Sequence, residues 1–116
     1  MIVDFRCRPA PLATLERSRI EHFQKVFDFR LTRSYREGSV ELLLEEMDEA
    51  GVDKGVIIGR QNTKAGHLNN SNDDIARMVA QYPERFVGIG GIDTSDPQEA
   101  IREMESCVGE LGMRGE

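Results

Sequence analysis

The sequence has few cysteines and histidines and no tryptophan: its 116 residues include only Cys7, Cys107, His22 and His67. Two cysteines so far apart give neither a disulfide framework nor the paired spacing of a zinc site, which is typical of a compartment that keeps thiols reduced. Two scattered histidines add a poor ligand set for tetrahedral zinc. We therefore expect a cytoplasmic protein that holds no zinc tightly.

Long hydrophobic runs and an excess of basic charge are also missing. The chain passes from Met1 to Asp4 and Arg6 without the apolar core of a secretory signal, and no later stretch approaches a membrane span. Its 15 basic residues are outnumbered by 21 acidic ones. A net charge of −6 repels polyanions. We expect neither nucleic acid nor a membrane surface as a partner.

The composition that remains is that of an ordinary globular protein, with 39% hydrophobic and 31% charged residues. The length fits a single domain over residues 1–116. A complete parallel barrel, by contrast, usually needs about 250 residues. Length alone therefore predicts one domain of modest size.

Three short apolar runs predict β-strands near residues 2–6, 55–59 and 86–92, since continuous apolar runs are typical of buried parallel strands. They consist of Ile2, Val3 and Phe5, of Val56, Ile57 and Ile58, and of Phe86, Val87, Ile89 and Ile92. The connection over residues 10–38 predicts one helix, because apolar residues recur there at roughly helical spacing, at Leu15, Ile20, Phe23, Val26 and Phe27.

Three further helices have clear start signals at Ser39, at Ser71 and at Asp96, which is followed by Pro97. Gly51 predicts the end of the first of them. Helical spacing assigns to their buried faces the residues Val40, Leu43, Leu44 and Met47, then Ile75, Val79 and Tyr82, and finally Ile101, Met104, Val108 and Leu111. The acidic residues Glu45, Glu46, Asp48 and Glu49 are then expected on the solvated side.

Alternation of strand and helix at about 30 residues per unit predicts an α/β fold with a parallel sheet, either an open doubly wound sheet or part of a barrel. The order of the strands separates the two, because a doubly wound sheet reverses its order at a switch point. We expect sequential order with the helices on one side.

Several segments together resemble the amidohydrolase-related family of barrel enzymes. They are Ile2-Val3-Asp4, the stretch from Met47 to Lys54, the stretch from Tyr82 to Gly88, and the segment from Glu110 to Gly115. The resemblance implies a TIM-barrel-like fold, of which about three units and the opening of a fourth strand are present. It also implies a metal-dependent hydrolase or decarboxylase class.

Enzymes of this family typically bind a metal, often zinc, through a His-x-His pair that ends the first strand. The matching positions here are Arg6 and Arg8. A guanidinium stays protonated and has no lone pair to offer a cation, so it cannot replace imidazole. No metal site and no other cofactor is therefore evident.

Asp4, Arg6 and Arg8 alternate along the first strand, so we expect them on one face at the barrel mouth. They form either a fork that binds a substrate carboxylate or phosphate, or a structural network of ion pairs. The loop over residues 60–70 adds Arg60 as a binding candidate and His67. Asp4 and His67 are the candidates for catalysis.

Other polar features have structural explanations. Asp93 precedes a natural turn into a capped helix, Gly88 to Gly91 lack the spacing of a dinucleotide fingerprint, and Cys7 is expected to be a buried, inert thiol.

The leading hypothesis is an amidohydrolase-related protein that acts on small anionic substrates and is inactive as an isolated chain. A noncatalytic module for small-anion binding or oligomerisation, and a truncated gene product, are the alternatives. Open strand edges, and inward faces at Val56, Ile58, Val87 and Ile89 without an opposite wall, predict a homo-oligomer or a missing C-terminal half.

Overall fold

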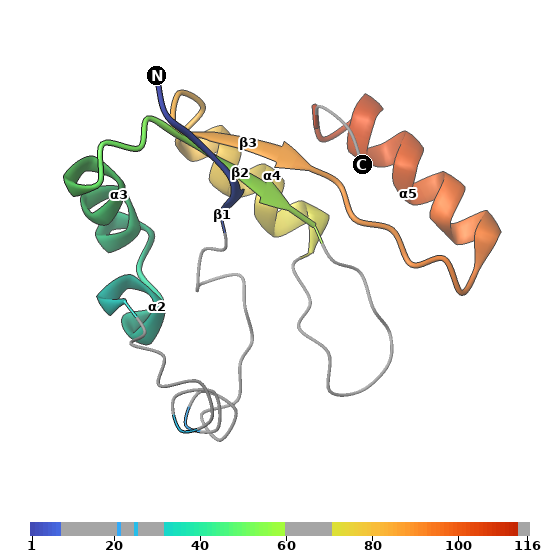
Figure 1. The fold of residues 1–116 in the computed structure, drawn as a ribbon. Coiled ribbons are helices and arrows are strands. Elements are labelled where there is room, and N and C mark those ends of the chain that lie inside the picture. Colours follow the sequence, from blue (N-terminus) through green and yellow to red (C-terminus); the bar gives the residue numbers. More distant parts are fainter. Residues whose placement is uncertain (8–20, 22–24, 26–31, 60–70, 114–116) are drawn as a thin grey trace.

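A parallel three-stranded sheet forms the centre of the molecule. The computed structural model describes residues 1–7, 21, 25, 32–59 and 71–113. The strands are β1 (Val3–Cys7), β2 (Lys54–Ile58) and β3 (Phe86–Ile89), in the order β1-β2-β3, and both pairings are parallel (Figure 1). The predicted sequential order is confirmed. Ile92 lies outside β3, because the strand ends at Ile89, before Gly90 and Gly91.

The helices are α2 (Arg33–Glu37), α3 (Val40–Glu49), α4 (Asn72–Gln81) and α5 (Pro97–Gly109). All three predicted N-caps are confirmed. Ser39 accepts from the N–H of Leu42, Ser71 from that of Asp74, and Asp96 from those of Gln98 and Glu99. Gly51 follows α3 in the left-handed region, with φ of 71°, as a helix stop requires. The helix predicted around Leu15 to Phe27 lies outside the described residues, apart from residues 21 and 25.

One hydrophobic core lies between a single face of the sheet and α3, α4 and α5. Its buried members are Cys7, Met47, Ile57, Ile75, Met78, Phe86, Cys107 and Met113. Gly88 of β3 allows α4 to approach closely, since a Cβ there would lie 2.9 Å from Cγ2 of Ile75. Close packing therefore explains this glycine. No described helix is long and apolar enough to cross a membrane.

The buried face of α5 differs from the prediction. Ala100 and Cys107 are buried, whereas Ile101, Met104 and Val108 are 56%, 43% and 60% exposed. Successive helical residues are about 100° apart, so the buried face of α5 lies one residue away from its more apolar stripe. Leu111, just after α5, packs against the core as predicted, but within α5 itself the hydrophobic spacing assigned the wrong face.

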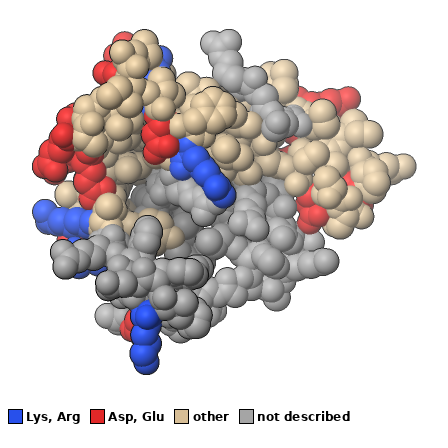
Figure 2. Space-filling view, in the orientation of Figure 1, with Lys and Arg blue, Asp and Glu red and all other residues tan. Residues whose placement is uncertain are grey.

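Two smaller expectations about burial also fail. Val56 is only 5% exposed, so it does not lack a covering wall, although Ile58 is 41% exposed. Glu46 is half-buried, because its carboxylate accepts hydrogen bonds from the Ser34 N–H at 2.9 Å and from the Ser34 hydroxyl at 2.5 Å. It therefore connects α3 to the start of α2. Other acidic residues of α3, Glu45 and Glu49 among them, are exposed, and acidic side chains gather over this side in Figure 2.

Candidate functional site

The carboxyl ends of the three strands are the natural place for a site, because in parallel α/β folds the loops after the strands carry the chemistry. β1 ends at Cys7, β2 is followed by Gly59, and β3 is followed by Gly90 and Gly91. The connection from β3 to α5 is the only one of these loops that lies wholly within the described residues.

Asp4 and Arg6 stand on either side of Phe5 in β1, and both are exposed. Oδ1 of Asp4 accepts a hydrogen bond from the backbone N–H of Arg6 at 3.0 Å. The register of β1 against β2 shifts between Asp4 and Cys7, where three steps along β1 match two along β2. Such a bulge interrupts the strict alternation from which a shared face was predicted. Arg8, Arg60 and His67 lie outside the described residues.

Cys7 projects into the core and is 5% exposed, as predicted. Burial, together with the nearby negative charge of Asp4, raises the pKa of the Cys7 thiol from 9.0 to about 11. A thiol that stays protonated at neutral pH is a poor nucleophile. Cys7 is therefore part of the packing and not of a reactive site.

Asn72, the first residue of α4, is a buried polar residue that the sequence analysis missed. It is 1% exposed, and its amide holds the backbone of Gly91 from both sides: Nδ2 donates to the Gly91 carbonyl at 2.8 Å and Oδ1 accepts from the Gly91 N–H at 2.8 Å. Nδ2 also donates to Oε1 of Glu103 at 2.7 Å. One side chain thus connects α4, the end of β3 and α5.

Gly59 completes this junction. A Cβ at Gly59 would lie 2.4 Å from Oδ1 of Asn72 and 2.5 Å from the backbone nitrogen of Gly91, so only glycine fits. Asn72 stands within a run of polar capping residues, which is why its sequence context indicated a helix start and nothing more.

Asp93 lies in the turn between β3 and α5, where its Oδ1 accepts from the N–H of Ser95 at 2.9 Å. This is the local pattern by which aspartate stabilises a turn. The contact supports the structural explanation of Asp93.

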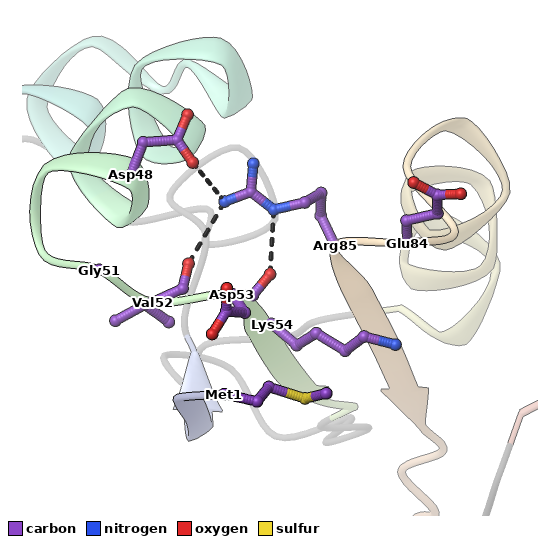
Figure 3. A pocket seen from close by; sticks show the side chains of 8 residues that line it. All are labelled: Met1, Asp48, Gly51, Val52, Asp53, Lys54, Glu84 and Arg85. Carbon is purple, nitrogen blue, oxygen red and sulfur yellow. Dashed lines mark hydrogen bonds and ion pairs between the residues drawn. The ribbon is translucent and has the colours of Figure 1, made fainter.

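An open pocket of about 650 Å³ lies at the opposite end of the sheet (Figure 3). Arg85 spans it: its guanidinium donates to Oδ1 of Asp48 at 2.8 Å, to the carbonyl of Asp53 at 3.0 Å and to that of Val52 at 3.3 Å. This end, where β2 and β3 begin, corresponds to the face of barrels that serves stability. The pocket is lined by Met1, Asp48, Gly51, Val52, Asp53, Lys54, Glu84 and Arg85.

A catalytic metal does not fit the side chains found here. Within the described ranges, no three His, Cys, Asp or Glu side chains lie close enough to hold a metal ion. Arg6 and Arg8 stand at the positions where the resemblance to the family implies a histidine pair, and guanidinium cannot coordinate a cation.

The sequential parallel sheet with helices on one face places the chain in the class of TIM-barrel-type α/β folds. The sequence profile of the family described as "Amidohydrolase" matches residues 3–115. The chain belongs to this family.

Three proteins illustrate the relationship. A gamma-resorcylate decarboxylase of Polaromonas sp. (strain JS666 / ATCC BAA-500) is 34% identical over 86 residues, which are 74% of this chain and 26% of the relative. A 2-keto-4-carboxy-3-hexenedioate hydratase of Sphingobium sp. (strain NBRC 103272 / SYK-6) is 32% identical over 85 residues, or 62% of this chain and 25% of the relative.

The third protein is a solved structure, an uncharacterized TIM-barrel protein, Bb4693, from Bordetella bronchiseptica. It superposes with a TM-score of 0.81 at 33% identity and covers 97% of this chain and 41% of its own. The chain thus spans about a quarter of the length of the two curated relatives.

Proposed function

We propose that this chain contributes the substrate-binding first quarter of an amidohydrolase-family decarboxylase or hydratase whose substrate is a small carboxylate. The single observation that carries the proposal is the match to relatives whose names, a resorcylate decarboxylase and a carboxy-hexenedioate hydratase, both describe carboxylates. The reaction of the whole protein is part of this proposal, because the match covers so little of each relative.

Arg6, Arg8 and Arg60 are proposed to bind the carboxylate. A guanidinium donates two parallel hydrogen bonds to a carboxylate and keeps its charge at every physiological pH. The exposed position of Arg6, and the bond from its backbone N–H to Asp4, support this role, because Asp4 fixes the backbone from which the Arg6 side chain projects.

Asp4 and His67 are the proposed groups for proton transfer, with Asp4 also orienting Arg6. We expect the 116-residue chain by itself to bind a carboxylate without turning it over, since a complete barrel site draws residues from the ends of several strands. The buried thiols of Cys7 and Cys107, which form no disulfide, are consistent with a cytoplasmic location.

Titration calorimetry with gamma-resorcylate tests this function, with resorcinol as the matched compound that lacks the carboxylate. We expect binding of gamma-resorcylate only, and a roughly 10- to 100-fold weaker Kd for Arg6→Gln, because a charge-assisted hydrogen bond is removed. Arg102→Gln, an exposed arginine of α5, is the control. Equal binding of resorcinol, or an unchanged Kd for Arg6→Gln, would reject the proposal.

A noncatalytic anion-binding module is the second candidate, and the arginines in place of the histidine pair favour it. Joining this chain to the remaining three quarters of the Polaromonas decarboxylase separates the two candidates. Release of carbon dioxide from gamma-resorcylate by this chimera supports an enzyme, whereas tight binding without release supports the module.

A further inference from the structure

The side-chain amide of Asn72 is fully bonded inside the molecule. A carboxamide has two N–H donors, and here one donates to the carbonyl of Gly91 at 2.8 Å and the other to Oε1 of Glu103 at 2.7 Å. Its oxygen accepts from the N–H of Gly91 at 2.8 Å. The start of α4 needs none of these bonds, because Ser71 caps that helix. The amide therefore has a role other than starting the helix.

This amide continues the hydrogen-bond ladder between β2 and β3 beyond the end of the strands. The N–H of Gly59 donates to the carbonyl of Ile89 at 2.7 Å, so the backbone groups of Ile89 face β2. Alternate residues of a strand direct their backbone groups to the same side, and the next groups due to face β2 are those of Gly91. Both are bonded to Asn72. A side chain of α4 thus takes the place of a β2 residue in the ladder.

The junction lies at the carboxyl end of the sheet, where the chains that follow β2 and β3 begin. Gly59 and Gly91 are both buried, and Gly59 has no room for a side chain beside the amide oxygen of Asn72. The amide therefore fixes how the two chains stand relative to each other as they leave the sheet. Arg60, one of the proposed carboxylate-binding residues, follows Gly59 directly in the sequence.

Glu103 extends the same contact to α5. It is half-buried, and its carboxylate makes a charge-assisted hydrogen bond with Nδ2 of Asn72. Gly91 lies at the start of the connection from β3 to α5 and Glu103 lies in α5 itself, so Asn72 holds this connection on both sides. The turn between them is fixed locally, where Asp93 accepts from the N–H of Ser95.

We propose that Asn72 is a positioning residue for the carboxylate site, an inference that rests on the proposed function. It acts through Gly59 and Gly91, and it is not a ligand-binding residue itself, because it is 1% exposed and both of its donors are in use. A site whose backbone is held in place before binding loses less conformational entropy when the ligand arrives. Loss of the amide should therefore weaken ligand binding as well as the fold.

Asn72→Ala removes all three bonds, and hydrogen exchange and titration calorimetry measure the effect. In the ligand-free variant the N–H of Gly91 should exchange at least tenfold faster, because its acceptor is gone. The Kd for gamma-resorcylate should rise about tenfold. Asn72→Asp, which keeps the shape and the acceptor but loses both donors, should also raise the Kd, and it takes the place of the alanine variant if circular dichroism shows that variant to be unfolded.

Met78→Ala is the control, because it also removes a buried side chain of α4, here from the hydrophobic core. Both proteins are measured well below their unfolding temperatures. If Asn72 only stabilised the fold, the two variants would behave alike. We expect Met78→Ala to lower the unfolding temperature but to leave the Kd and the exchange of the Gly91 N–H close to those of the wild type.

Three results would overturn this role of Asn72 while the wild type still binds gamma-resorcylate. They are an unchanged Kd in Asn72→Ala, unchanged exchange of the Gly91 N–H in that variant, and an equal loss of binding in Met78→Ala. A wild-type chain that binds no gamma-resorcylate would instead reject the proposed function and this inference with it. The wild-type titration therefore distinguishes the two failures.

Discussion

At the scale of single residues, the junction of Asn72, Gly59 and Gly91 is tightly packed and fully hydrogen-bonded at the Asn72 amide. Asn72 is buried with each of its polar atoms bonded, and Gly59 has no room for a side chain. Buried amides that are fully bonded stabilise strongly, because removal of one partner leaves the other unsatisfied.

Gly59→Ala should therefore be strongly destabilising. The new Cβ would meet backbone and a bonded amide, neither of which can move without loss of hydrogen bonds, so we expect a loss of about 2–4 kcal/mol in the free energy of unfolding. Gly109→Ala is the matched control, since nothing lies within 4 Å of the new Cβ and its helical backbone favours alanine. Urea unfolding of both variants measures the difference. Equal stabilities would show that the junction is not rigid.

This junction also shows what the sequence leaves open at the residue scale. Asn72 stands among Ser71, Asp73 and Asp74, so local pattern predicts a capped helix start, which is correct. Its contacts to Gly91 and Glu103 span 19 and 31 residues of the chain. No local pattern contains such long-range contacts. The sequence predicted that Asp4 and Arg6 lie in the first strand, but it did not predict the register shift between Asp4 and Cys7.

At the scale of elements, the helix ends and the buried faces of α3 and α4 were predictable, but the buried face of α5 was not. Caps at Ser39, Ser71 and Asp96 depend on neighbouring residues only, and all three form as predicted. The face that α5 buries depends on which side chains fit against the rest of the molecule. The small residues Ala100 and Cys107 are buried, and the larger apolar residues Ile101, Met104 and Val108 are exposed.

A pair of serine substitutions tests the orientation of α5. Cys107 is fully buried and Val108 is 60% exposed. Cys107→Ser should lower the free energy of unfolding by about 1–3 kcal/mol, because it places a hydroxyl in the core. Val108→Ser should change it by less than about 0.5 kcal/mol. Thermal unfolding followed by circular dichroism compares the two, and a larger effect at Val108 would restore the face that the hydrophobic spacing predicted.

At the scale of the whole molecule, stability should depend on alkaline pH through the thiol of Cys7. Because the folded pKa of about 11 exceeds the ordinary value of 9.0, the unfolded chain loses this proton first as pH rises. The protonated Cys7 thiol contributes fully to the free energy of unfolding below pH 9.0. This contribution is lost between pH 9.0 and about 11, where the free energy of unfolding should fall by about 2 kcal/mol.

Denaturant unfolding at a series of pH values across that window measures this fall, and Cys7→Ala is the control because alanine cannot ionise. The pKa of Tyr82 is also raised, by burial and by the neighbouring Glu41, so the alanine variant should keep a smaller alkaline dependence. An identical pH dependence in both proteins would mean that the Cys7 thiol does not titrate differently in the folded state.

Arg85 shows that the two ends of the sheet have different roles, structural at the amino ends of the strands and functional at their carboxyl ends. Arg85 joins the stretch from Met47 to Lys54 to the stretch from Tyr82 to Gly88, which are two of the segments that resemble the family, and it does so at the amino ends of β2 and β3. These two segments, which resemble the family, therefore form structural contacts far from the carboxyl ends of the strands. A family member can therefore change the reactive groups at the carboxyl ends of its strands and still keep these segments. Similarity in these segments is thus stronger evidence for the fold than for the reaction.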